Sequence, residues 1–157
     1  MKLEDPVLSW ILTDERLRSL SSDQCQAVIE ALLAVVLADG RRTDDEMRRV
    51  RRELMRLPWR WDHKQEDAER ALEAAQAHLT AHAADVASGA LAAQVAARLP
   101  ELPAREAVLK MLFAVAIADG ITASEEARIA TFRDAFAITP ERAHQLRGAA
   151  GTSNPRP

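Results

Sequence analysis

The chain has 157 residues, the length of a typical single domain. Its 48% hydrophobic content suffices for a sizeable core, whereas 5 Gly, 3 Phe and no Tyr disfavour an all-β sandwich or barrel. The formal net charge of −3 argues against a globally basic nucleic-acid binder. No apolar run reaches the ~20 residues of a membrane span, and the acidic N-terminus is unlike a secretory signal peptide. We therefore expect a cytoplasmic, all-α protein without a transmembrane segment.

Helix signals recur along the first part of the chain. Asp5-Pro6 combines a capping carboxylate with a proline at the first helical position. Ser21 or Ser22 can cap a second helix, which is apolar nearly all round and ends at Asp39-Gly40. A third helix begins at Thr43 and is closed by Pro58. We place the second of these helices at the centre of the fold.

The remaining helices are predicted from helix propensity and from the positions of proline, glycine and capping residues. A long Ala- and Glu-rich helix begins near His63, and the helical stretch 68–99 is broken at Asp85 or Ser88-Gly89. After the prolines of 100–103, a second strongly apolar helix ends at Asp119-Gly120. Two further helices have their start signals at Thr122 or Ser124 and at Thr139-Pro140.

These signals predict an all-α fold, a compact bundle of seven or eight helices with two pseudo-repeated helical hairpins. We expect residues 1–147 to form a single helical domain. Residues 148–157 are rich in Gly, Ser, Pro and Asn and are expected to be a disordered tail. The single Cys25 excludes an internal disulfide and a cysteine-based zinc site.

The internal repeat is the most informative feature of the sequence. Its two Ala-Asp-Gly motifs each follow an apolar helix and lie 80 positions apart. In each copy the Gly suits the left-handed end of a helix, and a Thr-x-x-Glu capping box then starts the next one. The matched segments are Leu32-Leu33-Ala34-Val35-Val36-Leu37-Ala38-Asp39-Gly40 and Leu112-Phe113-Ala114-Val115-Ala116-Ile117-Ala118-Asp119-Gly120.

The aspartates of the repeat need a separate explanation, because an acid at a helix C-terminus opposes the helix dipole. If the two apolar helices pack together, Asp39 and Asp119 approach each other, and a cation between them would offset their repulsion. With Glu46 and either Glu125 or Glu126 they form a set of hard oxygen ligands suited to a divalent metal, Ca²⁺ in the first place or Mg²⁺. Exposed capping groups and carboxylates paired with Arg remain the alternatives.

The repeated motif resembles the TerB-like (tellurite-resistance) family and the central domain of membrane-anchored DnaJ-like co-chaperones. The resemblance covers roughly residues 22–136. It implies a compact helical bundle with an acidic, metal-binding type of site in a tellurite-resistance or stress-response context. The family's Asp corresponds to Asp39 and Asp119. Its downstream Glu corresponds to Glu46 and, in the second copy, to Glu126 by spacing or Glu125 by the capping box.

A dense basic stretch between residues 41 and 60 holds eight Arg against four acidic residues. Arg48, Arg52 and Arg56 recur at every fourth position, which predicts one exposed ridge on the third helix. The ridge is either a solvated face that pairs with acidic neighbours or a docking surface for an acidic partner, nucleic acid or a membrane surface. The lack of interleaved aromatic residues disfavours single-stranded nucleic acid as that partner.

Other reactive residue types favour structural roles. His78 and His82 lack the His-Glu-x-x-His arrangement of a zinc site, and we expect an exposed pair. Cys25 has no neighbouring base that would make it a nucleophile. Trp10 is expected in the core or at its edge. One of the loop residues Trp59 and Trp61 is expected to cover the bundle.

The sequence shows no catalytic Ser/His/Asp order, phosphate-binding Gly loop or Cys-x-x-Cys. Our first hypothesis is therefore a non-enzymatic TerB-like stress-response protein with a divalent-cation site. The second is an adaptor that docks an unidentified acidic protein partner through the Arg ridge. The third is a metal-dependent hydrolase. The oligomeric state stays open.

Overall fold

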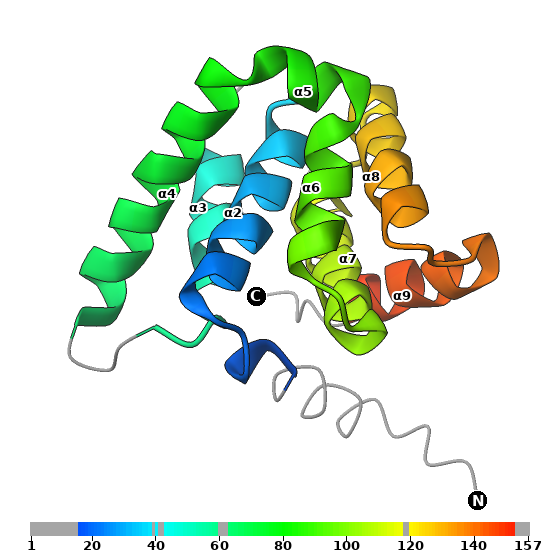
Figure 1. Ribbon diagram of the computed structural model, residues 1–157. Helices are drawn as coiled ribbons and strands as arrows, with labels where there is room; N and C mark the ends of the chain where they lie inside the picture. Colours follow the sequence, from blue (N-terminus) through cyan, green and yellow to red (C-terminus); the bar gives the residue numbers. More distant parts are fainter. Residues whose placement is uncertain (1–15, 39, 41–42, 60–62, 118–119, 153–157) are drawn as a thin grey trace, which may run out of the picture.

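The computed structural model describes residues 16–38, 40, 43–59, 63–117 and 120–152 (Figure 1). These ranges are helical with no strand, which confirms the all-α class. The expected count of seven or eight helices is not confirmed, because a helical segment at 16–18 precedes the helices labelled α2 to α9. Those helices are α2 (Ser22–Val36), α3 (Asp44–Leu54), α4 (Lys64–Ala81), α5 (Ala83–Ser88), α6 (Ala90–Arg98), α7 (Leu102–Ile117), α8 (Ala123–Ala135) and α9 (Pro140–Thr152).

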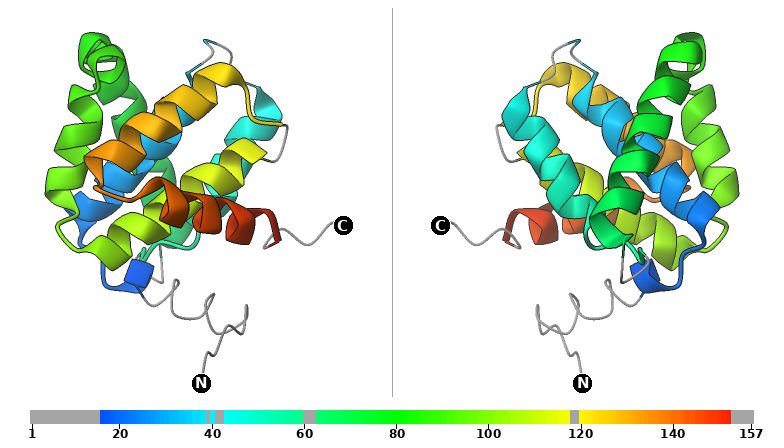
Figure 2. Two further views of the ribbon diagram at one scale, coloured as in Figure 1. Left: turned by 90° about the vertical axis from the view of Figure 1, so that its right-hand side faces the viewer. Right: turned by 90° about the vertical axis from the view of Figure 1, so that its left-hand side faces the viewer.

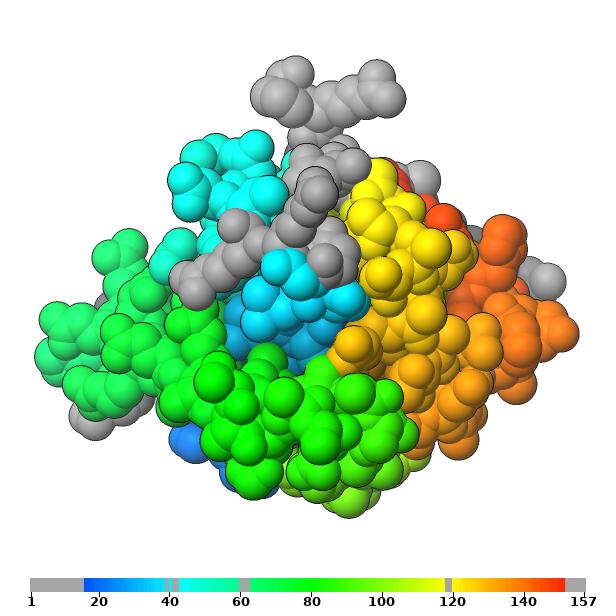
Figure 3. Space-filling view, turned by 90° about the horizontal axis from the view of Figure 1, so that it is seen from above, coloured from blue at the N-terminus to red at the C-terminus, as the bar shows by residue number. Residues whose placement is uncertain are grey.

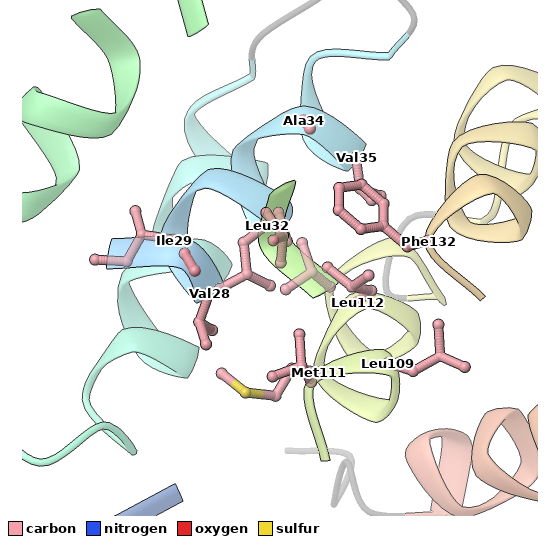
Figure 4. Close-up of a cluster of buried hydrophobic side chains, with 14 of the residues drawn as sticks. Val28, Ile29, Leu32, Ala34, Val35, Leu109, Met111, Leu112 and Phe132 are labelled. Carbon is pink, nitrogen blue, oxygen red and sulfur yellow. The ribbon is translucent and has the colours of Figure 1, made fainter. Parts of the chain in front are cut away.

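Helix α2 is the centre of the bundle, as its sequence predicts. Eleven of its 15 residues are buried. It contacts α3, α4, α6, α7 and α8, so apolar side chains are needed on nearly every face. In the core, Leu32 of α2 points toward Leu112 of α7, and Phe132 of α8 lies next to Val35 (Figure 4).

Helix α7 is the second buried helix and packs directly on α2. This contact confirms the expectation that the two apolar helices of the repeat lie side by side. The hairpins α2–α3 and α7–α8 meet through further contacts of α2 with α8 and of α3 with α7. The described parts of the repeat therefore share one core.

Helices α4, α5 and α6 form an arch over α2 (Figure 1). The expected break at Ser88-Gly89 is confirmed, since Gly89 takes φ 85° between α5 and α6. A second break, at His82, separates α4 from α5. Asp85, the other expected break point, lies within α5.

The expected disordered tail is wrong for residues 148–152, which belong to α9. Helix α9 lies across α7, as Figure 2 shows. Ala143, Leu146 and Ala150 are buried in that contact, and their burial offsets the low helix propensity of the glycines in α9. Residues 153–157 lie outside the described residues.

The end of α3 also differs from expectation, since the helix stops at Leu54 rather than at Pro58. The indole Nε1 of Trp59 donates a hydrogen bond to the carbonyl of Leu54 at 2.6 Å. Its ring packs against the core, so Trp59 confirms the expectation that a loop tryptophan covers the bundle. Trp10 and Trp61 lie outside the described residues.

Two glycines allow a paired test of the backbone. Gly89→Ala should lower the free energy of unfolding by about 1–2 kcal/mol, because a side chain disfavours positive φ. The new Cβ would also lie 3.2 Å from Cγ2 of Thr131. Gly148→Ala should instead raise the free energy of unfolding by about 0.5–1 kcal/mol, because Gly148 lies within α9 and no atom is close to a new Cβ. Urea unfolding measures both values, and equal effects would contradict the assignment.

Candidate functional site

The two Ala-Asp-Gly turns end their helices in the same way. Gly40 and Gly120 have φ of 74° and 83°, the left-handed region expected for each. Their N–H groups donate to the carbonyls of Leu37 and Ile117, both at 3.1 Å. Asp39 and Asp119, the central residues of the expected metal site, lie outside the described residues.

Two of the expected metal ligands hold helix N-termini. Glu46 Oε2 accepts from the Thr43 N–H, and Glu125 Oε1 accepts from the Thr122 N–H, each at 3.1 Å. The threonine hydroxyls accept the reciprocal bonds at 3.1 Å, which completes both capping boxes. In this geometry the counterpart of Glu46 is Glu125, which is buried.

The third glutamate points elsewhere. Glu126 is exposed, and its Oε1 forms an ion pair with Nη1 of Arg147 on α9 at 3.0 Å. Within the described ranges, no group of three or more His, Cys, Asp or Glu residues is placed to hold a metal ion. A cation site at the repeat therefore stays a prediction that depends on Asp39 and Asp119.

The arginines of the third helix do not form the single exposed ridge that their spacing predicts. Arg48 and Arg52 are exposed on α3, and Arg48 pairs with Asp45 of the same helix at 3.1 Å. Arg56 lies beyond the end of α3, so the helical spacing no longer applies to it. Its side chain is only 18% exposed and pairs with Glu53 at 3.0 Å.

The structure confirms part of what the sequence predicts for the reactivity of Cys25 and the exposure of the histidines. Burial raises the pKa of the Cys25 thiol to about 11, which disfavours the nucleophilic thiolate at neutral pH. The rings of His78 and His82 lie 4.4 Å apart. His82 is exposed, but His78 is only partly so, because it is drawn into a polar network that the sequence analysis missed.

That network is centred on Glu30, a buried acid on the central helix α2. Its Oε2 accepts a hydrogen bond from Nη1 of Arg98 on α6, and its Oε1 lies 3.2 Å from Nε2 of His78 on α4. Arg98 also binds Asp23, through Oδ1 at 2.9 Å, Oδ2 at 3.2 Å and the backbone carbonyl at 2.8 Å. The network thus links both legs of the arch to α2.

This arrangement stabilises the charged form of Arg98. Burial alone would lower its pKa, but hydrogen bonds and charge attraction from Asp23 and Glu30 outweigh burial and raise the pKa above its usual value. The only local signal for the network is an acid inside the apolar run of α2. The sequence offers no signal for its partner 68 positions away.

Two hollows lie on opposite sides of α8. The first, about 180 Å³, lies between α8 and α9 over Phe113. Its arginines have carboxylate partners, since Arg147 pairs with Glu126 and Arg133 with Asp134, both at 3.0 Å. The second hollow, about 270 Å³, lies between the end of α2, α4, α5 and Arg128 of α8.

Among the described residues, every helix is too short or too polar to span a lipid bilayer.

The Glu30 network predicts a non-additive pair of variants. Arg98→Met should lower the free energy of unfolding by about 3 kcal/mol, because it removes the guanidinium that pairs with the buried carboxylate of Glu30. Glu30→Met combined with Arg98→Met should be less costly than the single variant, because no buried charge then remains. Urea unfolding measures both, with Arg70→Met on the exposed surface as the control. A double variant less stable than Arg98→Met would contradict the network's role.

Comparisons of the chain with protein-family models, with curated proteins and with solved structures found no match. The resemblance to the TerB-like family therefore depends on the repeated motif and neither gains nor loses support from these comparisons.

Proposed function

We propose that this chain is a non-enzymatic helical binding domain that docks an acidic protein partner through the outward face of α3, defined here by Arg48 and Arg52. The proposal rests mainly on the exposure of the Arg52 side chain and its lack of a partner among the described residues. This side chain is exposed and forms no ion pair or hydrogen bond with any residue that the structure describes. The pair of Arg48 with Asp45 joins two side chains that are 72% and 66% exposed, and such a pair contributes little.

The fold presents these two guanidinium groups on a fixed helix. Met47, Val50 and Leu54 are buried on the opposite face of α3. Arg51 adds an ion pair to Glu69 of α4 at 2.7 Å. Arg48 and Arg52 are one helical turn apart, a like-charge spacing that costs a few tenths of a kcal/mol in an isolated helix. A partner carboxylate would relieve that repulsion and could bind either guanidinium through two hydrogen bonds.

The TerB-like stress-response context belongs to this proposal as well. We treat the hairpins α2–α3 and α7–α8 as copies of one unit, supported by their matching capping boxes and Gly turns. Within that context a divalent-cation site is the second candidate function. The contact between α2 and α7 favours it, because a shared site requires the two hairpins to meet.

The docking proposal is tested by charge reversal. Arg48→Glu/Arg52→Glu should weaken binding of a fluorescein-labelled oligoglutamate peptide at least about fivefold at low salt, since attraction becomes repulsion at two positions. Fluorescence anisotropy measures the affinity. Circular dichroism checks the fold, which should be kept because both side chains are exposed.

Arg70→Glu on α4 combined with Arg18→Glu provides a matched control, because it changes the net charge equally on exposed positions outside α3. If this control weakens peptide binding as much as the α3 variant, the peptide senses only net charge and the docking proposal fails.

The cation candidate is tested by calorimetric titration of chelator-treated protein with Ca²⁺, Mg²⁺ and Zn²⁺. Binding should occur with Ca²⁺ in the first place and should disappear in Asp39→Asn/Asp119→Asn, because carboxylates are the expected ligands. Asp44→Asn/Asp45→Asn is the control at nearby exposed acids. Absence of binding heat and of any rise in melting temperature would reject the cation site and leave the docking proposal untouched.

A further inference from the structure

The hollow beneath α5 is built from four helices. Its lining includes Ala34 of α2, the C-cap residue Leu37, Leu79 of α4, Val86 and Ala87 of α5, and Arg128 of α8. Seen from above, the end of α2 lies in the recess between α5 and α8 (Figure 3). Apart from Arg128 and the hydroxyl of Thr80, every lining side chain is apolar.

Helix α5 spans this hollow without filling it. None of its residues is buried, although Ala83, Val86 and Ala87 line the cavity. The small alanines on α2 and α5 leave the space open. The cavity volume of about 270 Å³ is nearly twice that of an engineered apolar cavity of roughly 150 Å³ that accepts benzene. The space is therefore large enough for a small apolar body.

Arg128 is the charged group of this cavity. Its Nη1 donates to the carbonyl of Val86 at 3.2 Å. It forms no ion pair with any carboxylate that the structure describes, and burial lowers its pKa. A guanidinium group has five N–H donors in a fork that matches a carboxylate, so most of this donor capacity is open to a ligand. The arginines of the hollow between α8 and α9 differ, since they already have carboxylate partners.

We propose that the cavity beneath α5 binds a small monocarboxylic acid with an apolar body, the carboxylate on Arg128 and the chain against Ala34, Leu79 and Val86. Three features carry the proposal: a hollow bordered by four helices, apolar walls, and a partly buried guanidinium that has no acidic partner among the described residues. Arg48 and Arg52 of the α3 docking surface do not line this cavity, and neither do Glu46, Glu125 or Glu126 of the repeat, so the proposal does not rest on the docking surface.

The test uses octanoate as the probe and 1-octanol as its uncharged counterpart. Calorimetry should show saturable one-to-one binding of octanoate, and Arg128→Met should weaken it at least about tenfold, because a hydrogen-bonded charge is lost while the apolar stem remains. Octanol should bind the native protein at least about tenfold more weakly than octanoate. Ala87→Leu should weaken both probes, since it places a larger side chain in the cavity.

Arg133→Met provides the matched control on the same helix, because Arg133 lines the other hollow. It should leave octanoate affinity unchanged. Arg128→Lys replaces Arg128→Met as the test variant if Arg128→Met does not fold. It should keep part of the octanoate affinity, because lysine retains the positive charge but cannot bind the carboxylate through two parallel hydrogen bonds. Lack of saturable octanoate binding would overturn the proposal. So would equal affinity for octanol, or equal losses in the Arg128 and Arg133 variants.

Discussion

The fold depends on how a carboxylate is accommodated inside its central helix. Glu30 lies on the buried face of α2, where an unpaired charge would cost several kcal/mol. Arg98 on α6 donates a hydrogen bond to it, and Nε2 of His78 on α4 lies 3.2 Å from its other oxygen. The legs of the arch are therefore fixed on α2 by a polar contact with defined geometry as well as by apolar packing. The same arrangement positions α5, which joins those legs.

Sequence reasoning succeeded where structure is determined by neighbouring residues. The capping boxes at Thr43 and Thr122 and the turn at Gly89 follow from short-range hydrogen bonding and backbone preference. The two apolar helices were predicted because burial on all sides leaves a continuous hydrophobic pattern. Their mutual contact followed from the need to bury both.

The errors have long-range causes. Arg56 was placed on an exposed ridge because spacing alone does not reveal that α3 ends two residues earlier. Residues 148–152 have a coil-like composition, yet packing of α9 on α7 keeps them helical. The Glu30–Arg98 contact and the cavity beneath α5 each join segments far apart in sequence. For the candidate site, the sequence identified the repeated acids and predicted both capping boxes, and the structure shows that Glu46 and Glu125 are the capping glutamates.

The contact between Trp59 and Leu54 gives the last turn of α3 an optical probe of its own. The indole donates to a carbonyl at the helix end while its ring lies against the core. Indole emission shifts with the polarity around the ring and with its hydrogen bonding. Any event that loosens the end of α3 from the bundle, including strain transmitted along the helix, will therefore change the emission of Trp59, one of the three tryptophans of the chain.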